Sequence, residues 1–136
     1  MSCWRKYTCN ALKDVDKDLV CRALDEIGYC LNEDVKMVRT SYGEDDTNSS
    51  LCDGALVIKK EHKQIPVGVT FANSQGELEI QGDFWSTGID HKSLVQQLTD
   101  HYLKLYTIQQ CELNGYTVEN LQQTENGIEY EAYAWA

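Results

Sequence analysis

The longest regular pattern of apolar and polar positions in the chain spans Asp90–Gly115 and predicts one helix of roughly 25 residues. Asp90 can cap the first turn with its carboxylate, and Gly115 can end the helix because glycine adopts the left-handed conformation at little steric cost. Apolar residues near the helical period would form one stripe that faces a core: Leu94, Val95, Leu98, Tyr102, Leu105, Tyr106, Ile108 and Leu113. We therefore expect the rest of the chain to be organised around this helix.

A second, shorter helix is predicted after Asp14 or Asp16, either of which can be its N-cap, and it ends at Gly28. The other patterns predict strands at Cys3–Cys9, Val35–Thr40, Ala55–Lys60, Val67–Ala72, Leu78–Phe84, Tyr116–Leu121 and Ile128–Trp135. Short turns join most of these strands. We expect an α+β fold with a mainly antiparallel sheet of about six or seven strands, two helices on one face, and a ferredoxin-like-related arrangement.

Polarity separates the two faces of several predicted strands. In Leu78–Phe84 the apolar positions alternate with Glu79, Gln81 and Asp83, as in a half-buried strand. In the last strand the same alternation places Tyr133 and Trp135 on the face opposite the core. The segment Ser41–Gly54 has few apolar residues and is predicted to be a polar loop.

Length and charge narrow the class of protein. The chain of 136 residues fits a single domain over residues 1–136. Its net charge of −10 repels nucleic acid and anionic membranes, so we expect neither as a partner. Met1–Asn10 carries charge early and lacks the apolar stretch of a secretory signal. Six cysteines without such a signal indicate a reducing compartment, and we expect a cytoplasmic protein.

Residue types that support catalysis or metal binding are present, but they do not form a recognisable pattern. No cysteine pair is spaced as C-x-x-C, and zinc ligands usually come in close pairs. His91 and His101 lie ten residues apart, which on one helix is too far to share a metal ion. The acidic run Glu44–Asp46 lacks the ligand order of a calcium loop. We predict no catalytic residue, no metal and no cofactor, with thiol chemistry at a cysteine as the open alternative.

The most distinctive short run is Gly82-Asp83-Phe84-Trp85. One interpretation is that its aromatic residues clamp the long helix to the sheet. The other is that Trp85 contacts a small ligand or a partner. Together with Tyr133 and Trp135, Trp85 is a partner-binding candidate, because aromatic side chains contribute much of the energy of protein interfaces.

Several runs in the same order resemble one family. They include Ala23-Leu24-Asp25-Glu26-Ile27-Gly28-Tyr29, Ala55-Leu56-Val57-Ile58-Lys59, Gly82-Asp83-Phe84-Trp85, Asn114-Gly115-Tyr116 and Asn126-Gly127-Ile128. The chain resembles the plastid and cyanobacterial hypothetical chloroplast reading frame thirty-five family and its bacterial relatives, which carry a domain of unknown function. Cys3 and Trp4 stand where that family usually has His and Phe. The resemblance implies a small α+β protein associated with an AAA-type ATPase, in the plastid stroma for a plastid member, and transfers no catalytic residue.

These observations favour a non-enzymatic interaction or adaptor module that acts within a protein assembly. Its partner would be another protein, with the AAA-type ATPase implied by the resemblance, or a second copy of the chain. Two alternatives stay open: a thiol-dependent enzyme or redox protein, and a small-ligand binder that uses the region of Trp85. Thiol reactivity separates the first alternative from the interaction module, because a catalytic thiolate has a lowered pKa.

Overall fold

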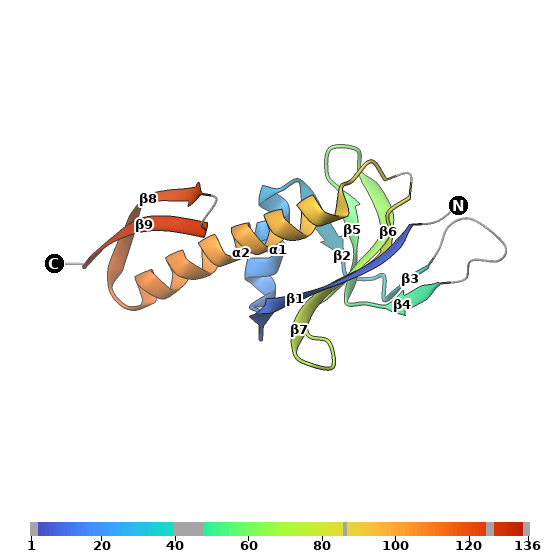
Figure 1. Ribbon diagram of the computed structural model, residues 1–136, viewed down its shortest axis with the longest axis horizontal. Helices are drawn as coiled ribbons and strands as arrows, with labels where there is room; N and C mark the ends of the chain where they lie inside the picture. Colours follow the sequence, from blue (N-terminus) through green and yellow to red (C-terminus); the bar gives the residue numbers. More distant parts are fainter. Residues whose placement is uncertain (1–2, 40–47, 86, 125–126, 135–136) are drawn as a thin grey trace.

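The computed structural model describes residues 3–39, 48–85, 87–124 and 127–134, and its arrangement is drawn in Figure 1. Two helices and nine strands are present in this part of the chain. In order they are β1 (Trp4–Lys13), α1 (Lys17–Glu26), β2 (Tyr29–Asn32), β3 (Met37–Arg39), β4 (Ser49–Leu51), β5 (Gly54–Ile58), β6 (Lys63–Thr70), β7 (Glu77–Asp83), α2 (His91–Leu113), β8 (Tyr116–Thr124) and β9 (Gly127–Ala134).

Five strands form the main sheet in the order β1-β7-β6-β5-β2, and every neighbouring pair is antiparallel. The other strands pair as two separate ribbons, β3 with β4 and β8 with β9. The α+β class, the antiparallel main sheet and the two helices are therefore confirmed. The strands β1 and β2, which precede and follow α1, are the two edges of the main sheet.

Both helices begin and end at the residues that the sequence indicates. Asp16 caps α1 and Asp90 caps α2, each by accepting backbone N–H groups of the first turn. Gly28 and Gly115 follow the two helices with φ of +96° and +81°, a conformation that favours glycine. Local chemistry alone sets these four boundaries.

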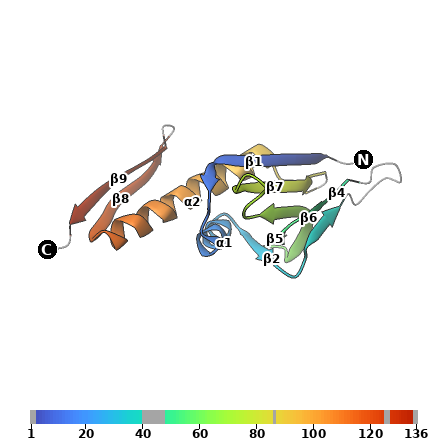
Figure 2. The same cartoon turned by 90° about the horizontal axis from the view of Figure 1, so that it is seen from below.

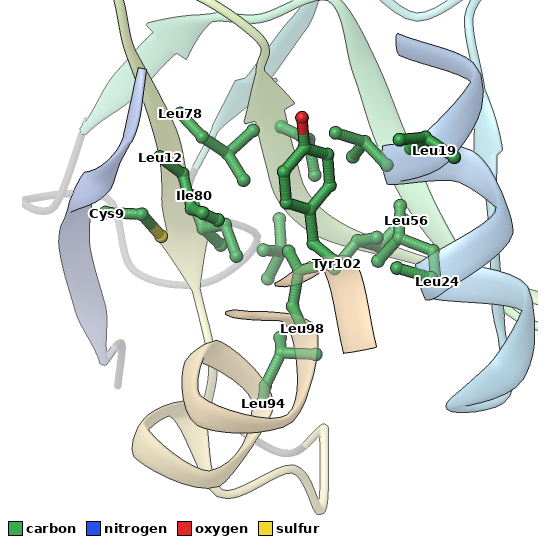
Figure 3. Close-up of a cluster of buried hydrophobic side chains, with 14 of the residues drawn as sticks. Cys9, Leu12, Leu19, Leu24, Leu56, Leu78, Ile80, Leu94, Leu98 and Tyr102 are labelled. Atoms are coloured by element: carbon green, nitrogen blue, oxygen red, sulfur yellow. The ribbon is translucent and has the colours of Figure 1, made fainter. Parts of the chain in front are cut away.

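The hydrophobic core lies between one face of the main sheet and both helices (Figure 3). The sheet contributes Leu56, Ile65, Val67, Val69, Leu78 and Ile80, and the helices contribute Leu19, Val20, Ala23, Leu24, Leu94, Leu98, Tyr102 and Leu105. Figure 2 gives the second view of this arrangement, with α2 continuing away from the sheet. The predicted burial of Leu98 and Leu105 is confirmed.

The opposite face of the main sheet is partly covered by the β3–β4 ribbon. Val38 of β3 is buried, and the hydroxyl of Ser50 donates a hydrogen bond of 3.0 Å to Oε1 of Gln81. Two other residues on the predicted polar face of β7 are buried as well, since Glu79 is only 9% exposed and Asp83 only 1%. Alternation identified the two faces of β7 correctly, but it could not reveal that a second layer covers the polar one.

Strands β6 and β7 approach each other closely at Gly82. A Cβ atom built there would lie 2.1 Å from the carbonyl oxygen of Pro66 and 2.5 Å from Cα of Val67. Both neighbours are backbone atoms, so they cannot move aside without a shift of β6. The glycine of the Gly82–Trp85 run is therefore needed for strand pairing.

Several predicted boundaries differ in the structure. Strand β1 runs on to Lys13, β6 begins at Lys63 where Val67 was predicted, and β8 runs on to Thr124. The strand expected at Val35–Thr40 is only Met37–Arg39, and the strand β2 at Tyr29–Asn32 precedes it. Within the polar loop expected over Ser41–Gly54, Ser49–Leu51 forms β4 by pairing with β3, while residues 41–47 lie outside the described part. Single strands this short carry almost no periodic signal, and their pairing partner decides whether they form.

Candidate functional site: an exposed arm at the C-terminal end

The second helix extends beyond the sheet that it covers. Its buried residues are Leu94, Leu98, Tyr102 and Leu105, whereas Tyr106 is 43% exposed and Leu113 is 74% exposed. A helix of 23 residues is about 34 Å long, which exceeds what the core beneath it occupies. The assignment of Tyr106 and Leu113 to the core stripe was therefore wrong, because the periodic pattern continues past the end of the sheet.

The β8–β9 ribbon packs against this extending part of α2 and not against the main sheet (Figures 1 and 2). We call the segment from Leu103 to Ala134 the arm: the distal half of α2 with β8 and β9. The last strand was expected in the core under the long helix. It lies instead in this separate ribbon, while the side chains of Ile128, Tyr130, Ala132 and Ala134 are outside the described ones.

Large apolar side chains accumulate on the arm surface. Of the eight large hydrophobic residues that are exposed in the described part of the chain, five lie here: Leu103, Tyr106, Leu113, Tyr116 and Tyr133. Three of them, Leu103, Tyr106 and Leu113, lie on α2, and exposed apolar side chains that gather on one element are candidates for an interaction site. Nothing in the sequence pattern indicated that Leu103 and Tyr116 are exposed, because a helix or a strand can bury a residue at either position.

Tyr133 is the one predicted partner-binding residue on the arm whose side chain is described. It is 50% exposed, and its hydroxyl donates a hydrogen bond of 2.5 Å to Oε2 of Glu131. This hydrogen bond and the nearby negative charge raise the pKa of Tyr133. Glu131, on the same side of β9, is exposed too. Trp135 lies outside the described residues.

The Gly82–Trp85 run lies at the end of β7 and contacts both the N-terminal segment and the start of α2. Asp83 is buried, and its Oδ1 accepts hydrogen bonds from the backbone N–H groups of Cys3 (2.8 Å) and Trp85 (3.0 Å). Phe84 is 5% exposed and meets the ring of His91 edge-on, with 5.6 Å between ring centroids. Phe84 therefore clamps the helix, whereas Trp85 is 40% exposed. Trp85 and Tyr133 are not brought together, because they lie near opposite ends of α2.

The histidines of α2 make intramolecular contacts. His91 stacks on Tyr7 and its Nδ1 is hydrogen-bonded to the Tyr7 hydroxyl. His101 Nδ1 lies 2.8 Å from Oε1 of Glu26, which also lies 2.9 Å from Nζ of Lys104. Although partial burial acts to raise the pKa of Glu26, these two hydrogen bonds lower it overall. Both clusters tie α2 to neighbouring elements.

Burial raises the pKa of the thiols of Cys9, Cys21 and Cys52. Cys52 is half-buried, and its Sγ lies 3.6 Å from the carbonyl oxygen of Val35. Cys21 and Cys111 are also half-buried, and Cys30 is the exposed cysteine. A raised pKa disfavours the thiolate, so Cys9, Cys21 and Cys52 are poor nucleophiles.

Metal ligands do not converge in the described part of the chain, where no three His, Cys, Asp or Glu side chains lie together in a group that could hold an ion. The prediction that the protein binds no metal remains a prediction. Among the described residues, no helix is both long and apolar enough to cross a membrane.

One protein-family model matches a region of the chain that includes most of the arm. A family model described as "Protein of unknown function (DUF1257)" matches residues 23–129, which is 107 of the 136 residues. The chain belongs to the DUF1257 family. The matched region runs from the middle of α1 into β9, so it contains α2, β8 and the Gly82–Trp85 run. The chain matches no curated protein and no solved structure.

Proposed function

We propose that this DUF1257-family chain is a non-enzymatic interaction module that binds a partner protein through its arm. The observation that carries the proposal is the set of five large apolar side chains exposed on the arm. Tyrosine is enriched among the residues that dominate binding energy at interfaces, and three of the five are tyrosines. The main sheet with its two helices would serve as the rigid body that presents this surface.

The exposed side chains of the arm leave room for a partner, because Leu113 is 74% exposed and Tyr106 is 43% exposed. A partner that packed along α2 and the ribbon would cover the apolar side chains and remove them from water.

Charge favours a basic partner over a second copy of the chain. From residue 103 to residue 134 the chain carries one lysine against five glutamates, a net charge of −4. The lysine, Lys104, is already paired with Glu26 of α1. Two such arms would repel each other, whereas a partner with basic residues around an apolar centre would be attracted.

The β8–β9 ribbon offers a second mode of contact. It has two strands, so each strand has one edge that no other strand of the described part occupies. An extended segment of the partner could add to such an edge through backbone hydrogen bonds. The narrower resemblance to the plastid reading-frame family adds the proposal that the partner is an AAA-type ATPase.

A comparative capture experiment tests the proposal. The wild-type chain, a Leu113→Asp variant and a chain lacking residues 133–136 are used as bait in extract of the source organism, and bound proteins are quantified by mass spectrometry. Leu51→Asp is the matched control, because Leu51 is 77% exposed on β4, away from the arm. Circular dichroism verifies that each variant is folded.

We expect one partner to be captured by the wild-type and Leu51→Asp chains and lost from both arm variants. An AAA-type ATPase as that partner would support the narrower proposal. Equal capture by all four chains, or loss only in Leu51→Asp, would overturn the assignment of the arm as the interface.

A further inference from the structure

A pocket lies at the root of the arm, between the end of β1 and the middle of α2. Figures 1 and 2 show these two elements crossing there. Its volume is about 280 Å³. We call it the root pocket, and its lining residues are Leu12, Lys13, Asp14, Tyr102, Leu103 and Tyr106. Three of these, Leu103, Tyr106 and Tyr102, come from one turn of α2, so the pocket is continuous with the apolar surface of the arm.

Aromatic rings form one wall of the root pocket. Tyr102 and Tyr106 stack with 6.1 Å between ring centroids and 15° between ring planes. Tyr102 is 4% exposed, and its hydroxyl oxygen accepts a hydrogen bond of 3.0 Å from the backbone N–H of Asp16. Tyr106 is the outer ring of the pair and is 43% exposed. An immobilised inner ring thus supports an outer ring that solvent reaches.

The floor and the rim of the pocket differ in polarity. Leu12 is only 2% exposed and belongs to the core in Figure 3, so it supplies an apolar floor. Asp14 lies at the rim, and its backbone N–H donates a hydrogen bond of 3.1 Å to the carbonyl oxygen of Gly76. Its φ of +51° is uncommon for a residue other than glycine. The backbone that carries this carboxylate is therefore fixed.

Two lysines lie near this rim in the sequence, and only one of them lines the pocket. Lys13 is that lining residue, next to Asp14. Lys17 instead pairs with Glu33 at 2.5 Å and lies over the ring of Phe71. The acidic arm beyond Tyr106 adds negative charge on the other side. Lys13 and Asp14 cancel within the lining, so the preference for a cation rests on the net charge of −4 between residues 103 and 134.

We infer that the root pocket binds an arginine side chain of the partner protein, an inference that rests on the proposed function and names the chemistry of its anchor. Arginine combines an apolar stem, a planar cation that stacks on aromatic faces, and N–H donors that match a carboxylate. In the root pocket, Leu12 and Leu103 would contact the apolar stem. The ring of Tyr106 would stack on the planar cation, and the carboxylate of Asp14 would accept its N–H groups. An aliphatic anchor would leave the Asp14 carboxylate unmatched, and lysine lacks the planar group that stacks on a ring.

The test uses a small probe, so it does not depend on the partner. N-acetyl-arginine-N-methylamide is titrated into the isotope-labelled full chain and followed by NMR. The matched control probe is the citrulline analogue, which has the same shape without the charge. We expect saturable shifts at Leu12, Leu103 and Tyr106, with affinity for the citrulline probe at least about fivefold weaker.

Variants separate the parts of the recognition. Asp14→Asn should weaken binding of the arginine probe about fivefold or more. Tyr106→Leu should also weaken binding of this probe, but it should change the ratio of affinities for the arginine and citrulline probes less than Asp14→Asn does. Lys13→Gln should strengthen binding, because it removes a like charge from the rim. Asp34→Asn, an exposed acid remote from the pocket, is the control and should have no effect.

Equal affinity for the arginine and citrulline probes, or shifts that do not map to the root pocket, would overturn the inference. So would an unchanged affinity in a folded Asp14→Asn variant. These outcomes leave the capture experiment untouched, because its variants lie at Leu113 and at residues 133–136. Conversely, equal capture by the arm variants would reject the arm interface while the arginine preference of the pocket could still be measured.

Discussion

Replacing Leu98 by alanine tests whether the long helix is anchored by its middle. Leu98 is fully buried and belongs to the cluster that α1, α2 and the main sheet form together (Figure 3). The substitution removes three carbon atoms, which costs about 2–2.5 kcal/mol of transfer free energy at about 0.8 kcal/mol per methylene. The cavity that remains between three packed elements adds about 1–2 kcal/mol, so we expect a total loss of about 3–4.5 kcal/mol.

The same helix provides the control. Leu113 is 74% exposed, so Leu113→Ala should change the free energy of unfolding by less than about 0.5 kcal/mol. Both variants change leucine to alanine within α2, so differences in helix propensity cancel. The contrast between the two positions therefore reports tertiary burial alone.

Urea denaturation followed by far-UV circular dichroism measures both losses. The midpoint for Leu98→Ala should fall while the slope of free energy against urea stays near the wild-type value. A loss below about 1 kcal/mol at Leu98, or equal losses at Leu98 and Leu113, would refute the reasoning. The first result would mean that the site collapses around alanine, and the second that the arm is packed as tightly as the core.

Three further predictions follow from individual contacts. Gly82→Ala should destabilise the chain by at least about 1 kcal/mol in the same assay, because its new Cβ would overlap the backbone at Pro66, and a neutral effect would contradict the close approach of β6 and β7. The lowered pKa of Glu26 means that its contribution to stability is present above the unfolded-state pKa and is lost as pH falls through the folded one. Glu26→Gln should therefore destabilise the chain near neutral pH and have no effect in strong acid, as thermal melts across pH would measure. Maleimide labelling with peptide mass spectrometry should find the exposed Cys30 modified faster than Cys52, whose thiol pKa is raised by burial, and rapid labelling of Cys52 would support the thiol-enzyme alternative instead.

Features that depend on neighbouring residues in the chain were determined by the sequence itself. The ends of α2 follow from Asp90 and Gly115, because capping and left-handed termination act within one helical turn. The two faces of β7 follow from alternation, since successive side chains of a strand point to opposite sides. The same alternation predicts that Tyr133 lies on the face opposite the core, and Tyr133 is 50% exposed.

Other features were decided only by the tertiary structure. Tyr106 and Leu113 continue the apolar period of α2, yet they are exposed because the sheet ends before the helix does. Glu79 and Asp83 belong to a polar strand face, yet both are buried, and Ser50 of the β3–β4 ribbon contacts Gln81 on that face. The root pocket joins residues of β1 and α2 that are about ninety positions apart. A periodic pattern reports which side of an element is apolar, whereas burial also requires a second element opposite that side, and this second element is placed by the fold of the whole chain.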